Sequence, residues 1–341
     1  KGLTLTLYGS YSPAIKALEA FMEKYPQNVY VRKNVIQENI DENLKGLIDS
    51  YFRQDDMLAL VSAYSDYKAK YLFNFRFDTT LFQTAVAHRK LGFFDEALDI
   101  LRFLETRSGG TVGELVQLEK AQALLEKGDL TEARNTVAKF LQQYPNSSYD
   151  AEARQLLARI YRQQKSYPRA LLVYQQTLQK YDQNKQPLLA EIVPELYYDL
   201  AELQEETGNF VEAGEAFQDA ISSYNHPLDH QDTPEYIIKS HFLTADMHNK
   251  ALNDETALKS YQQAISLYAD KTNKEIIERV FWARYQIGAI YTRQDEDQLA
   301  LKVFKQLMDE KAGEGQLWKK LATENHRAIS RKLAYDQYLK E

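Results

Sequence analysis

The stretch DAEARQLLARIYRQQKSYPRALLVYQQTLQKYDQ, residues 150–183, decides the fold. In its first half, apolar side chains fall on one face of a helix: Leu157, Ala158 and Tyr161. The second half repeats this arrangement with Ala170, Tyr174 and Leu178. A short break between the halves ends at Pro168, a residue suited to the first turn of a helix. The stretch therefore predicts an antiparallel helical hairpin that must bury its apolar face against neighbours.

The same pattern recurs along the chain. We number each hairpin from the small residue of its second helix and call this residue the anchor. The anchors are Ala97, Ala133, Ala170, Ala213, Ala257 and Ala300. Another small residue lies twelve positions before each anchor: Ala85, Ala121, Ala158, Ala201, Ala245 and Gly288. A large apolar residue follows each anchor by four: Leu101, Val137, Tyr174, Phe217, Tyr261 and Phe304. Five before the anchor, three of the units carry glycine, where the first helix must end in a turn: Gly92, Gly128 and Gly208.

Six units in one register resemble the tetratricopeptide repeat, whose unit is two helices in about 34 residues. The resemblance implies an all-α fold, a right-handed superhelical solenoid of antiparallel hairpins. The later anchors are spaced more widely than this family period, so we expect longer helices or loops there. One of the expected loops is Thr106 to Gly113, which contains the pair Gly109-Gly110.

We predict three regions. Residues 1–77 form divergent repeats, with the first unit cut short at Lys1, so we expect the solenoid to continue before it. In this unit Gly2, Gly9 and Ala14 take the small, turn and anchor positions. Residues 78–309 form the six clear repeats, and residues 310–341 form a capping helix that turns polar toward its end. The aromatic segment Lys70 to Phe77 is either a buried junction or an exposed patch, and we expect burial.

Composition limits the functional classes. The chain has 341 residues and a net charge of −7, with no basic stripe, which argues against a nucleic-acid partner. It has no cysteine, so disulfides, thiolate metal sites and cysteine nucleophiles are excluded. No apolar run is long enough for a membrane span. The 24 tyrosines suit both repeat cores and recognition surfaces.

No motif predicts catalysis: the sequence contains no phosphate-binding glycine loop, no nucleophile elbow and no metalloprotease His-Glu-x-x-His. His226 and His230 lie four apart near two aspartates, but Pro227 favours a linker there. We expect His241 and His248 to be packing residues. We therefore predict a protein that is not an enzyme and that has no cofactor and no metal.

The resemblance implies that the first helix of each hairpin lines a concave groove. Positions six and three before the small residue, and one and four after it, should face this groove. In the first three clear repeats these positions include Phe82, Arg89, Leu115, Leu118, Gln122, Glu152, Gln155, Arg159 and Arg162. Later repeats supply Tyr198, Glu202, Phe242, Trp282 and Tyr285. As partner-binding residues we predict Phe82, Arg159, Arg162, Tyr198, Glu202, Phe242, Trp282 and Tyr285. The alternative is that the aromatic members pack between neighbouring helices.

Two Tyr-Pro phrases carry a second resemblance, FMEKYPQNVY at residues 21–30 and FLQQYPNSSYDAEA at residues 140–153. They are similar to repeats of bacterial outer-membrane assembly lipoproteins and periplasmic cell-division coordinators. The chaperone-binding branch of the repeat family would have Asn two before the small residue, where this chain has Leu156, Asp199, Leu243 or Gln286. We therefore expect a scaffold that binds other proteins or peptides in the bacterial periplasm or cell envelope. The alternatives are a cytoplasmic adaptor and the substrate-recognition arm of a larger enzyme.

Overall fold

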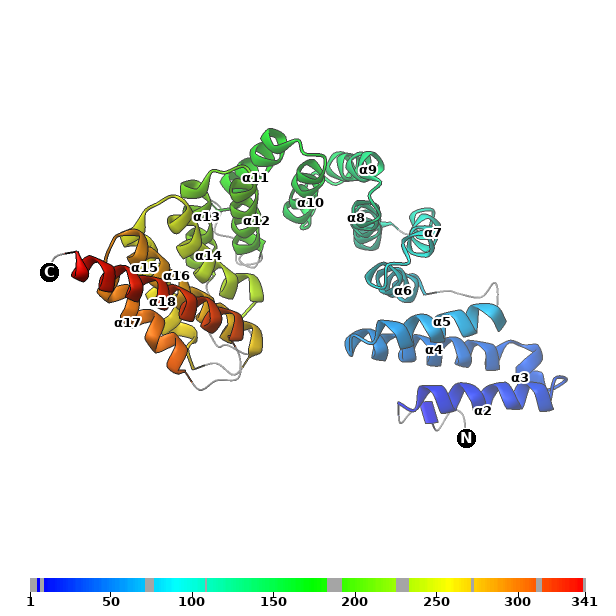
Figure 1. Ribbon diagram of the computed structural model, residues 1–341. Helices are drawn as coiled ribbons and strands as arrows, with labels where there is room; N and C mark the ends of the chain where they lie inside the picture. Colours follow the sequence, from blue (N-terminus) through cyan, green and yellow to red (C-terminus); the bar gives the residue numbers. More distant parts are fainter. Residues whose placement is uncertain are drawn as a thin grey trace. The chain divides into compact units, whose positions relative to one another are not determined.

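The computed structural model describes residues 5–6, 9–70, 77–107, 109–182, 192–224, 233–270, 273–310 and 315–339. Within these residues all regular structure is helical, so the predicted all-α array of hairpins is confirmed. The chain forms two compact units, Lys1–Ser166 and Tyr167–Glu341 (Figure 1).

In the first unit, first and second helices alternate along the chain, apart from the one-turn helix α3. They are α2 (Tyr11–Lys24), α3 (Val29–Arg32), α4 (Val35–Arg53), α5 (Met57–Lys70), α6 (Asp78–Lys90), α7 (Phe94–Glu105), α8 (Gly110–Lys127), α9 (Leu130–Gln143) and α10 (Asp150–Gln163). The first helices α6, α8 and α10 contact one another in sequence, and each second helix packs on its own first helix and on the next one.

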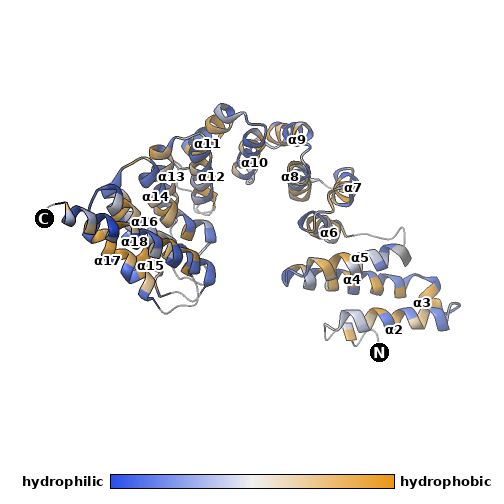
Figure 2. Cartoon of the chain, in the orientation of Figure 1, coloured by the Kyte–Doolittle hydropathy of each residue, from blue (hydrophilic) through white to orange (hydrophobic). Residues whose placement is uncertain are grey.

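The second unit continues the same alternation. Its helices are α11 (Tyr167–Asp182), α12 (Ile192–Glu206), α13 (Phe210–Ser223), α14 (Glu235–Lys250), α15 (Asp254–Tyr268), α16 (Lys274–Arg293), α17 (Asp297–Asp309) and α18 (Gln316–Tyr338). Figure 2 shows that individual helices carry an apolar side and a polar side, as the sequence spacing predicts.

Burial confirms the repeat register. All six anchors are 0% exposed, and so are the six large residues four positions after them. The small residues twelve before the anchors are also buried. The register extends into the divergent region. There Leu60 takes the anchor position, Ile48 the position twelve before it and Tyr64 the position four after it, and all three are buried. The core of each hairpin is therefore made by a small residue on each helix and a large residue one turn further on.

The turn inside each hairpin has one backbone conformation. The residue five before the anchor has a positive φ in every repeat, whether or not it is glycine: Gly9, Asp55, Gly92, Gly128, Lys165, Gly208, Leu252 and Asp295. The next residue donates its N–H to a carbonyl five positions back, as Asn253 does to His248 at 2.8 Å. This is the left-handed C-cap with its 6→1 hydrogen bond that ends many helices. Each first helix therefore stops at the same point of the register.

The two Tyr-Pro phrases also share one geometry. Tyr25 and Tyr144 are the C-cap residues of α2 and α9, and each donates its N–H to a carbonyl four residues earlier at 2.9 Å. Their rings tilt against Phe21 and Phe140 at 5.2 Å and 5.3 Å, with interplanar angles of 48° and 49°. The phrases are thus two copies of one helix-ending motif.

The predicted loop from Thr106 to Gly113 is too long, because α8 already begins at Gly110, with Gly109 in an extended conformation before it. In the aromatic segment Lys70 to Phe77, residues 71–76 lie outside the described residues. The three-region division at residues 77 and 309 stays a prediction.

Gly288 provides a direct test of the hairpin core. A Cβ atom at this position would lie 2.5 Å from Cε1 of the fully buried Phe304. We expect Gly288→Ala to lower the free energy of unfolding by about 1 kcal/mol, because overpacking of ~1–3 kcal/mol outweighs the ~1 kcal/mol gain in helix propensity. Urea unfolding measures the change. In Gly214→Ala, a matched helical control, the new Cβ would lie 3.3 Å from Cβ of Met247, so no loss of this size is expected.

Leu252 provides a test of the turn. Its φ is 59° and its side chain is 69% exposed, so it has backbone strain and little packing to lose. We expect Leu252→Gly to raise the free energy of unfolding by about 0.5–1 kcal/mol, because relief of the left-handed strain exceeds the extra entropy of glycine. The control Gln262→Gly, at an exposed position inside α15, should lower it by about 1 kcal/mol. Equal losses in both variants would contradict the strain at Leu252.

Candidate functional site

The first unit contains a cavity of about 220 Å³ on the first-helix side of its repeats. We call it the first-helix groove. Its lining residues are Phe82 of α6, then Leu115, Leu118, Glu119 and Gln122 of α8, and Glu152, Gln155, Leu156 and Arg159 of α10. Three consecutive repeats therefore contribute to one cavity, as expected for a repeat array whose first helices lie side by side.

The predicted groove positions account for most of this lining. Phe82 and Arg159, both predicted partner-binding residues, lie in the same cavity. The sequence prediction missed Glu119 and Leu156, which occupy the position two before the small residue. In the repeat family this position is known as a place for a chaperone-type Asn, and here it also lines the groove. Apolar side chains from all three helices and polar groups of α8 and α10 line the cavity together.

The groove is bordered by a charged cluster on α6 and α8. The guanidinium of Arg89 contacts the Glu119 carboxylate through Nε and Nη2, and its Nη1 donates to Oε1 of Glu126 at 2.7 Å. Burial alone would lower the pKa of Arg89, but the hydrogen bonds and charges of the two glutamates raise it. Burial raises the pKa of Glu119 despite the opposing effect of Arg89. The cluster fixes Glu119 at the edge of the cavity at the cost of desolvating a carboxylate.

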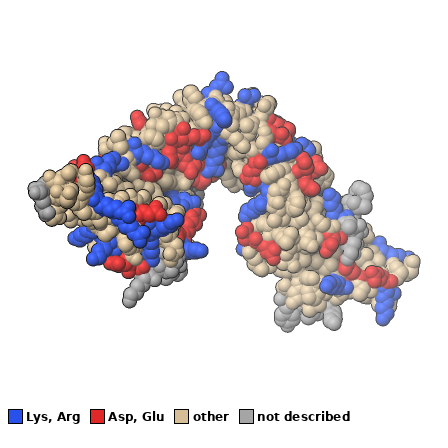
Figure 3. All heavy atoms as spheres, viewed as in Figure 1, with Lys and Arg blue, Asp and Glu red and all other residues tan. Residues whose placement is uncertain are grey.

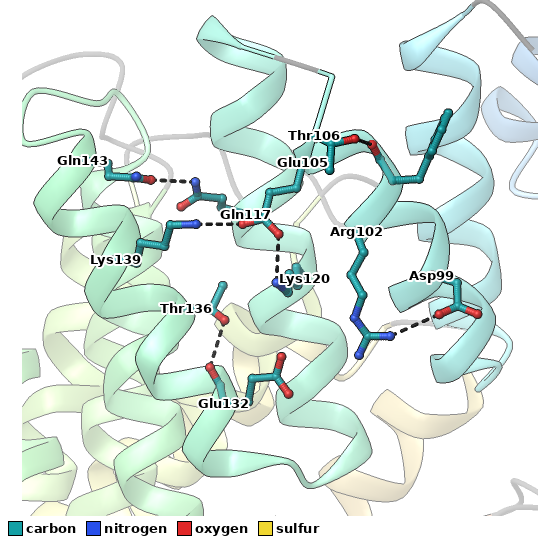
Figure 4. Close-up of polar contacts among 11 residues, drawn as sticks. Asp99, Arg102, Glu105, Thr106, Gln117, Lys120, Glu132, Thr136, Lys139 and Gln143 are labelled. Atoms are coloured by element: carbon teal, nitrogen blue, oxygen red, sulfur yellow. Dashed lines mark hydrogen bonds and ion pairs between the residues drawn. The ribbon is translucent and has the colours of Figure 1, made fainter.

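A second cluster holds the helices behind the groove. Figure 4 shows Glu105, the last residue of α7, between Lys120 of α8 and Lys139 of α9, with each Nζ 2.9 Å from a carboxylate oxygen. Nearby, Gln117 of α8 donates to Gln143 of α9 at 2.8 Å. Because Glu105 joins three helices, it fixes the position of α8, which carries four of the groove residues.

In the second unit the predicted aromatic residues pack against other rings. Tyr198 is half-buried, with its ring 5.5 Å from Phe217 and 5.7 Å from Tyr236. Burial first, and the adjacent carboxylate of Glu202 second, raise the pKa of Tyr198 well above its usual range. Its ring thus contacts both its own hairpin and the next first helix, as the packing alternative describes.

Trp282 and Tyr285 of α16 behave in the same way. The Trp282 ring lies 5.6 Å from Tyr261, edge to face. The Tyr285 ring lies 5.8 Å from Phe304 and 5.6 Å from Trp318, and its hydroxyl accepts a hydrogen bond from Asn325 at 3.0 Å. Both side chains keep partial exposure, so each combines packing with some accessible surface.

Phe242 corrects the sequence prediction. It is 0% exposed, and its ring lies 5.6 Å from Tyr268, which is itself fully buried. The C-terminal end of α15 covers the position that was expected to face the groove. Phe242 therefore belongs to the core and is not available to a partner. Arg162 and Glu202 are half-buried, and their role in binding stays a prediction.

The remaining surface and histidines add little to this site. On the face shown in Figure 3, acidic and basic side chains are interspersed over each unit. His241 is buried, which lowers its pKa to about 4, and it packs edge-on against Tyr268. His226 and His230 lie outside the described residues. Among the residues that are described, no cluster of His, Asp or Glu has the arrangement of a metal site, and no helix is long and apolar enough to span a membrane.

Residues 82–148 and 118–185 match the family model of the tetratricopeptide repeat. In this part of the chain the hairpins match the sequence pattern of the tetratricopeptide repeat. The matched region contains all the residues of the first-helix groove. Tetratricopeptide repeats as a class present extended surfaces that bind proteins, and proteins built from them are generally non-catalytic scaffolds. No curated protein matches the chain.

Solved structures show the same fold at low sequence identity. The C-terminal part of a tetratricopeptide repeat protein from Cytophaga hutchinsonii has a TM-score of 0.57 and 13% identity, covering 82% of this chain and 97% of its own. RapI in its apo form has a TM-score of 0.57 and 10% identity, covering 96% and 97%. PilW, a type IV pilus biogenesis factor, has a TM-score of 0.51 and 14% identity, covering 68% and 96%.

Glu105 gives this site a pH-dependent test. Burial would raise its pKa, but hydrogen bonds from Lys120 and Lys139 outweigh burial and lower it. Its stabilisation should therefore be complete above the unfolded pKa of about 4.3 and be lost as pH falls through the lower folded value. We expect Glu105→Gln to cost about 1–2 kcal/mol at pH ~7 and much less at pH ~3, measured by urea unfolding. The control is Glu255, which forms an exposed ion pair with Lys259. Glu255→Gln should change stability little at either pH.

Proposed function

We propose that this protein is a non-catalytic scaffold that holds a partner protein through the first-helix groove. The observation that carries the proposal is the cavity that Phe82, Leu115, Leu118, Leu156 and the polar residues of α8 and α10 line together. Apolar lining groups supply the binding energy for a partner side chain, and the charged edge sets its register.

The size of the cavity favours a peptide segment over a small metabolite. Its volume of about 220 Å³ is below the ~300–1,000 Å³ typical of small-molecule pockets. It suits one large apolar side chain of an extended segment whose backbone passes along the groove. The flanking residues of that segment would then lie near Glu119, Glu152 and Arg159. Repeat arrays create such elongated surfaces because each repeat adds one helix to the row.

We place this scaffold in the bacterial cell envelope, where it helps to assemble or hold a multiprotein complex. The two Tyr-Pro motifs support this location, because they resemble those of periplasmic repeat proteins and share one geometry here. PilW, a type IV pilus biogenesis factor, has the same fold. Tyr198, Trp282 and Tyr285 of the second unit are proposed as additional contacts, with most of each ring committed to packing.

The groove is tested by partner capture from a cell-envelope extract, using the full chain as bait. We expect Leu115→Ser combined with Leu118→Ser to lower the recovery of bound partners by about tenfold, because both half-buried side chains line the cavity. The matched control is Phe103→Ser, an equally drastic change at a half-exposed site on α7. Thermal unfolding of each variant shows whether the fold is kept.

The outcomes separate the candidate functions. Equal recovery by the groove variant and the control would exclude the first-helix groove as the binding surface. Fractionation of the native cells tests the location: recovery of the chain in the cytoplasmic fraction would favour an adaptor there. A catalytic domain in the same polypeptide would favour the recognition arm of an enzyme.

A further inference from the structure

A second and larger hollow lies in the first unit, on the side of the second helices. Its volume is about 340 Å³. The helix α4 forms its floor, and the second helices α2 and α5 form its walls, in agreement with Figure 1, where α4 lies between α2 and α5. We call it the α2–α5 groove. It shares no lining residue with the first-helix groove.

The α2–α5 groove has the length of two helical turns. Its lining runs from Ser12 to Glu19 on α2, from Leu44 to Tyr51 on α4 and from Ala59 to Tyr67 on α5. Within each helix the lining residues, single or in adjacent pairs, recur every three or four positions, so each helix presents one face. At a rise of 1.5 Å per residue these stripes are ~10–12 Å long. The hollow is therefore a trough that follows its three helices for about two turns, a length that suits a segment of helix.

The repeat register explains why the trough is open. In α5 the anchor position is taken by Leu60. The residue before it is Ala59, and the residues two and three positions after it are Ser62 and Ala63. At the same three positions α7 has Glu96, Asp99 and Ile100, and α9 has Glu132, Asn135 and Thr136. The side chains on the outer face of α5 are thus smaller than those at the same positions of the two following second helices.

The trough has rigid walls. The Tyr67 hydroxyl donates to the buried carboxylate of Asp41, and Nε2 of Gln37 contacts Asp41 at 2.8 Å and the Tyr67 hydroxyl at 3.2 Å. At the other wall, Tyr11 packs so closely on Gly46 that a Cβ there would lie 2.5 Å from the ring. Both second helices are thus fixed against α4, and the trough exists before any ligand binds. A preformed site costs less ordering entropy on binding.

The trough combines apolar lining residues from all three helices with opposite charges on its two walls. Ile15, Leu47, Tyr51 and Ala63 are only partly buried, and Leu58, one turn before Ser62 on α5, is 68% exposed. Lys16 is exposed on the α2 wall and Asp66 is exposed on the α5 wall. The remaining lining charge, Glu19, is half-buried and engaged within the chain.

We propose that the α2–α5 groove docks an amphipathic helix of a partner protein. The apolar stripe of that helix, at positions i, i+3 or i+4, and i+7, lies along Leu44, Leu47 and Tyr51 of the floor, between Ile15 and Ala63 of the two walls. One flank of the helix is acidic and pairs with Lys16, and the other is basic and pairs with Asp66. The helix occupant follows from the two-turn length of the trough, its small wall residues and the opposite charges of its rims. This surface is independent of the proposed first-helix groove.

The test is a selection of displayed helical peptides against the full chain. The library contains segments of about 14 residues, or ~20 Å of helix, built from Ala, Leu, Glu, Lys and Gln. We expect enriched sequences to carry the apolar stripe with one acidic and one basic flank. Ala63→Leu fills the trough, so it should weaken the binding of an enriched peptide by about tenfold or more in fluorescence anisotropy. Ser62→Leu is a second filling variant at an exposed position, and thermal unfolding confirms that both fold.

Charge variants test the pairing of Lys16 and Asp66 with the flanks of the bound helix. The expected results are the same for either direction of that helix. Lys16→Glu makes both walls acidic and should shift the selection to peptides that are basic on both flanks. Asp66→Lys should shift it to peptides that are acidic on both flanks. The paired variant Leu115→Ser with Leu118→Ser, in the first-helix groove, should leave peptide binding unchanged. This separates the present proposal from the proposed function.

Several results would overturn the proposal. One is a selection without a common apolar stripe, and another is an enriched peptide that binds the folded Ala63→Leu and Ser62→Leu variants as tightly as the wild type. A concentration-dependent dimer that Ala63→Leu abolishes would assign the trough to a second copy of this chain. Binding of a fluorescent fatty acid that Ala63→Leu abolishes, with no peptide enriched, would assign it to an acyl chain.

Discussion

Within each unit, the close contact between the two helices of a hairpin is the constraint on which the rest of the structure depends. It is most severe at Gly288, where no side chain fits between α16 and the ring of Phe304. In the other clear repeats alanine takes this position, and every anchor and every large residue after it is fully buried. Since isolated helices of this length are marginal in water, the packing at these positions is what makes them helices at all. The positions of the groove residues follow, because each first helix is fixed by this contact in a defined rotation.

This constraint is also why the fold could be predicted from sequence. Small and large residues at fixed spacing are visible without coordinates, and six units in one register exclude a chance arrangement. The left-handed turn was only partly predictable. Gly92, Gly128 and Gly208 indicate it, but Lys165 and Leu252 adopt the same conformation with no sign in their side chains. There the 6→1 hydrogen bond holds the turn at a residue that disfavours it.

The candidate site was predictable in position but not in exposure. Phe82, Leu118, Tyr198, Phe242 and Tyr285 all lie three residues before the small residue of their repeats, so the register places them on equivalent faces. Phe82 and Leu118 line a cavity, while Phe242 is covered by Tyr268. The difference arises from the residues at the ends of neighbouring helices, where the repeats vary in length. A spacing rule describes one hairpin and its helix faces, whereas exposure depends on how the next hairpin covers them.

The repeat structure therefore divides the chain into positions whose residue type the fold requires and positions, here called open positions, whose residue type can vary. The anchors, their partners and the turn residues are equivalent in every repeat, and they cannot distinguish one repeat protein from another. The two grooves of the first unit arise where repeats differ at the open positions. Leu115, Gln122 and Arg159 differ in chemistry along the first helices, and Ala59, Ser62 and Ala63 replace the larger side chains found on α7. An open position costs little stability when it changes, so a groove can be lined for a particular partner without disturbing the hairpin core. For this reason the specificity of the chain should be sought in the residues that break the repeat pattern, and on the second-helix side as well as the first.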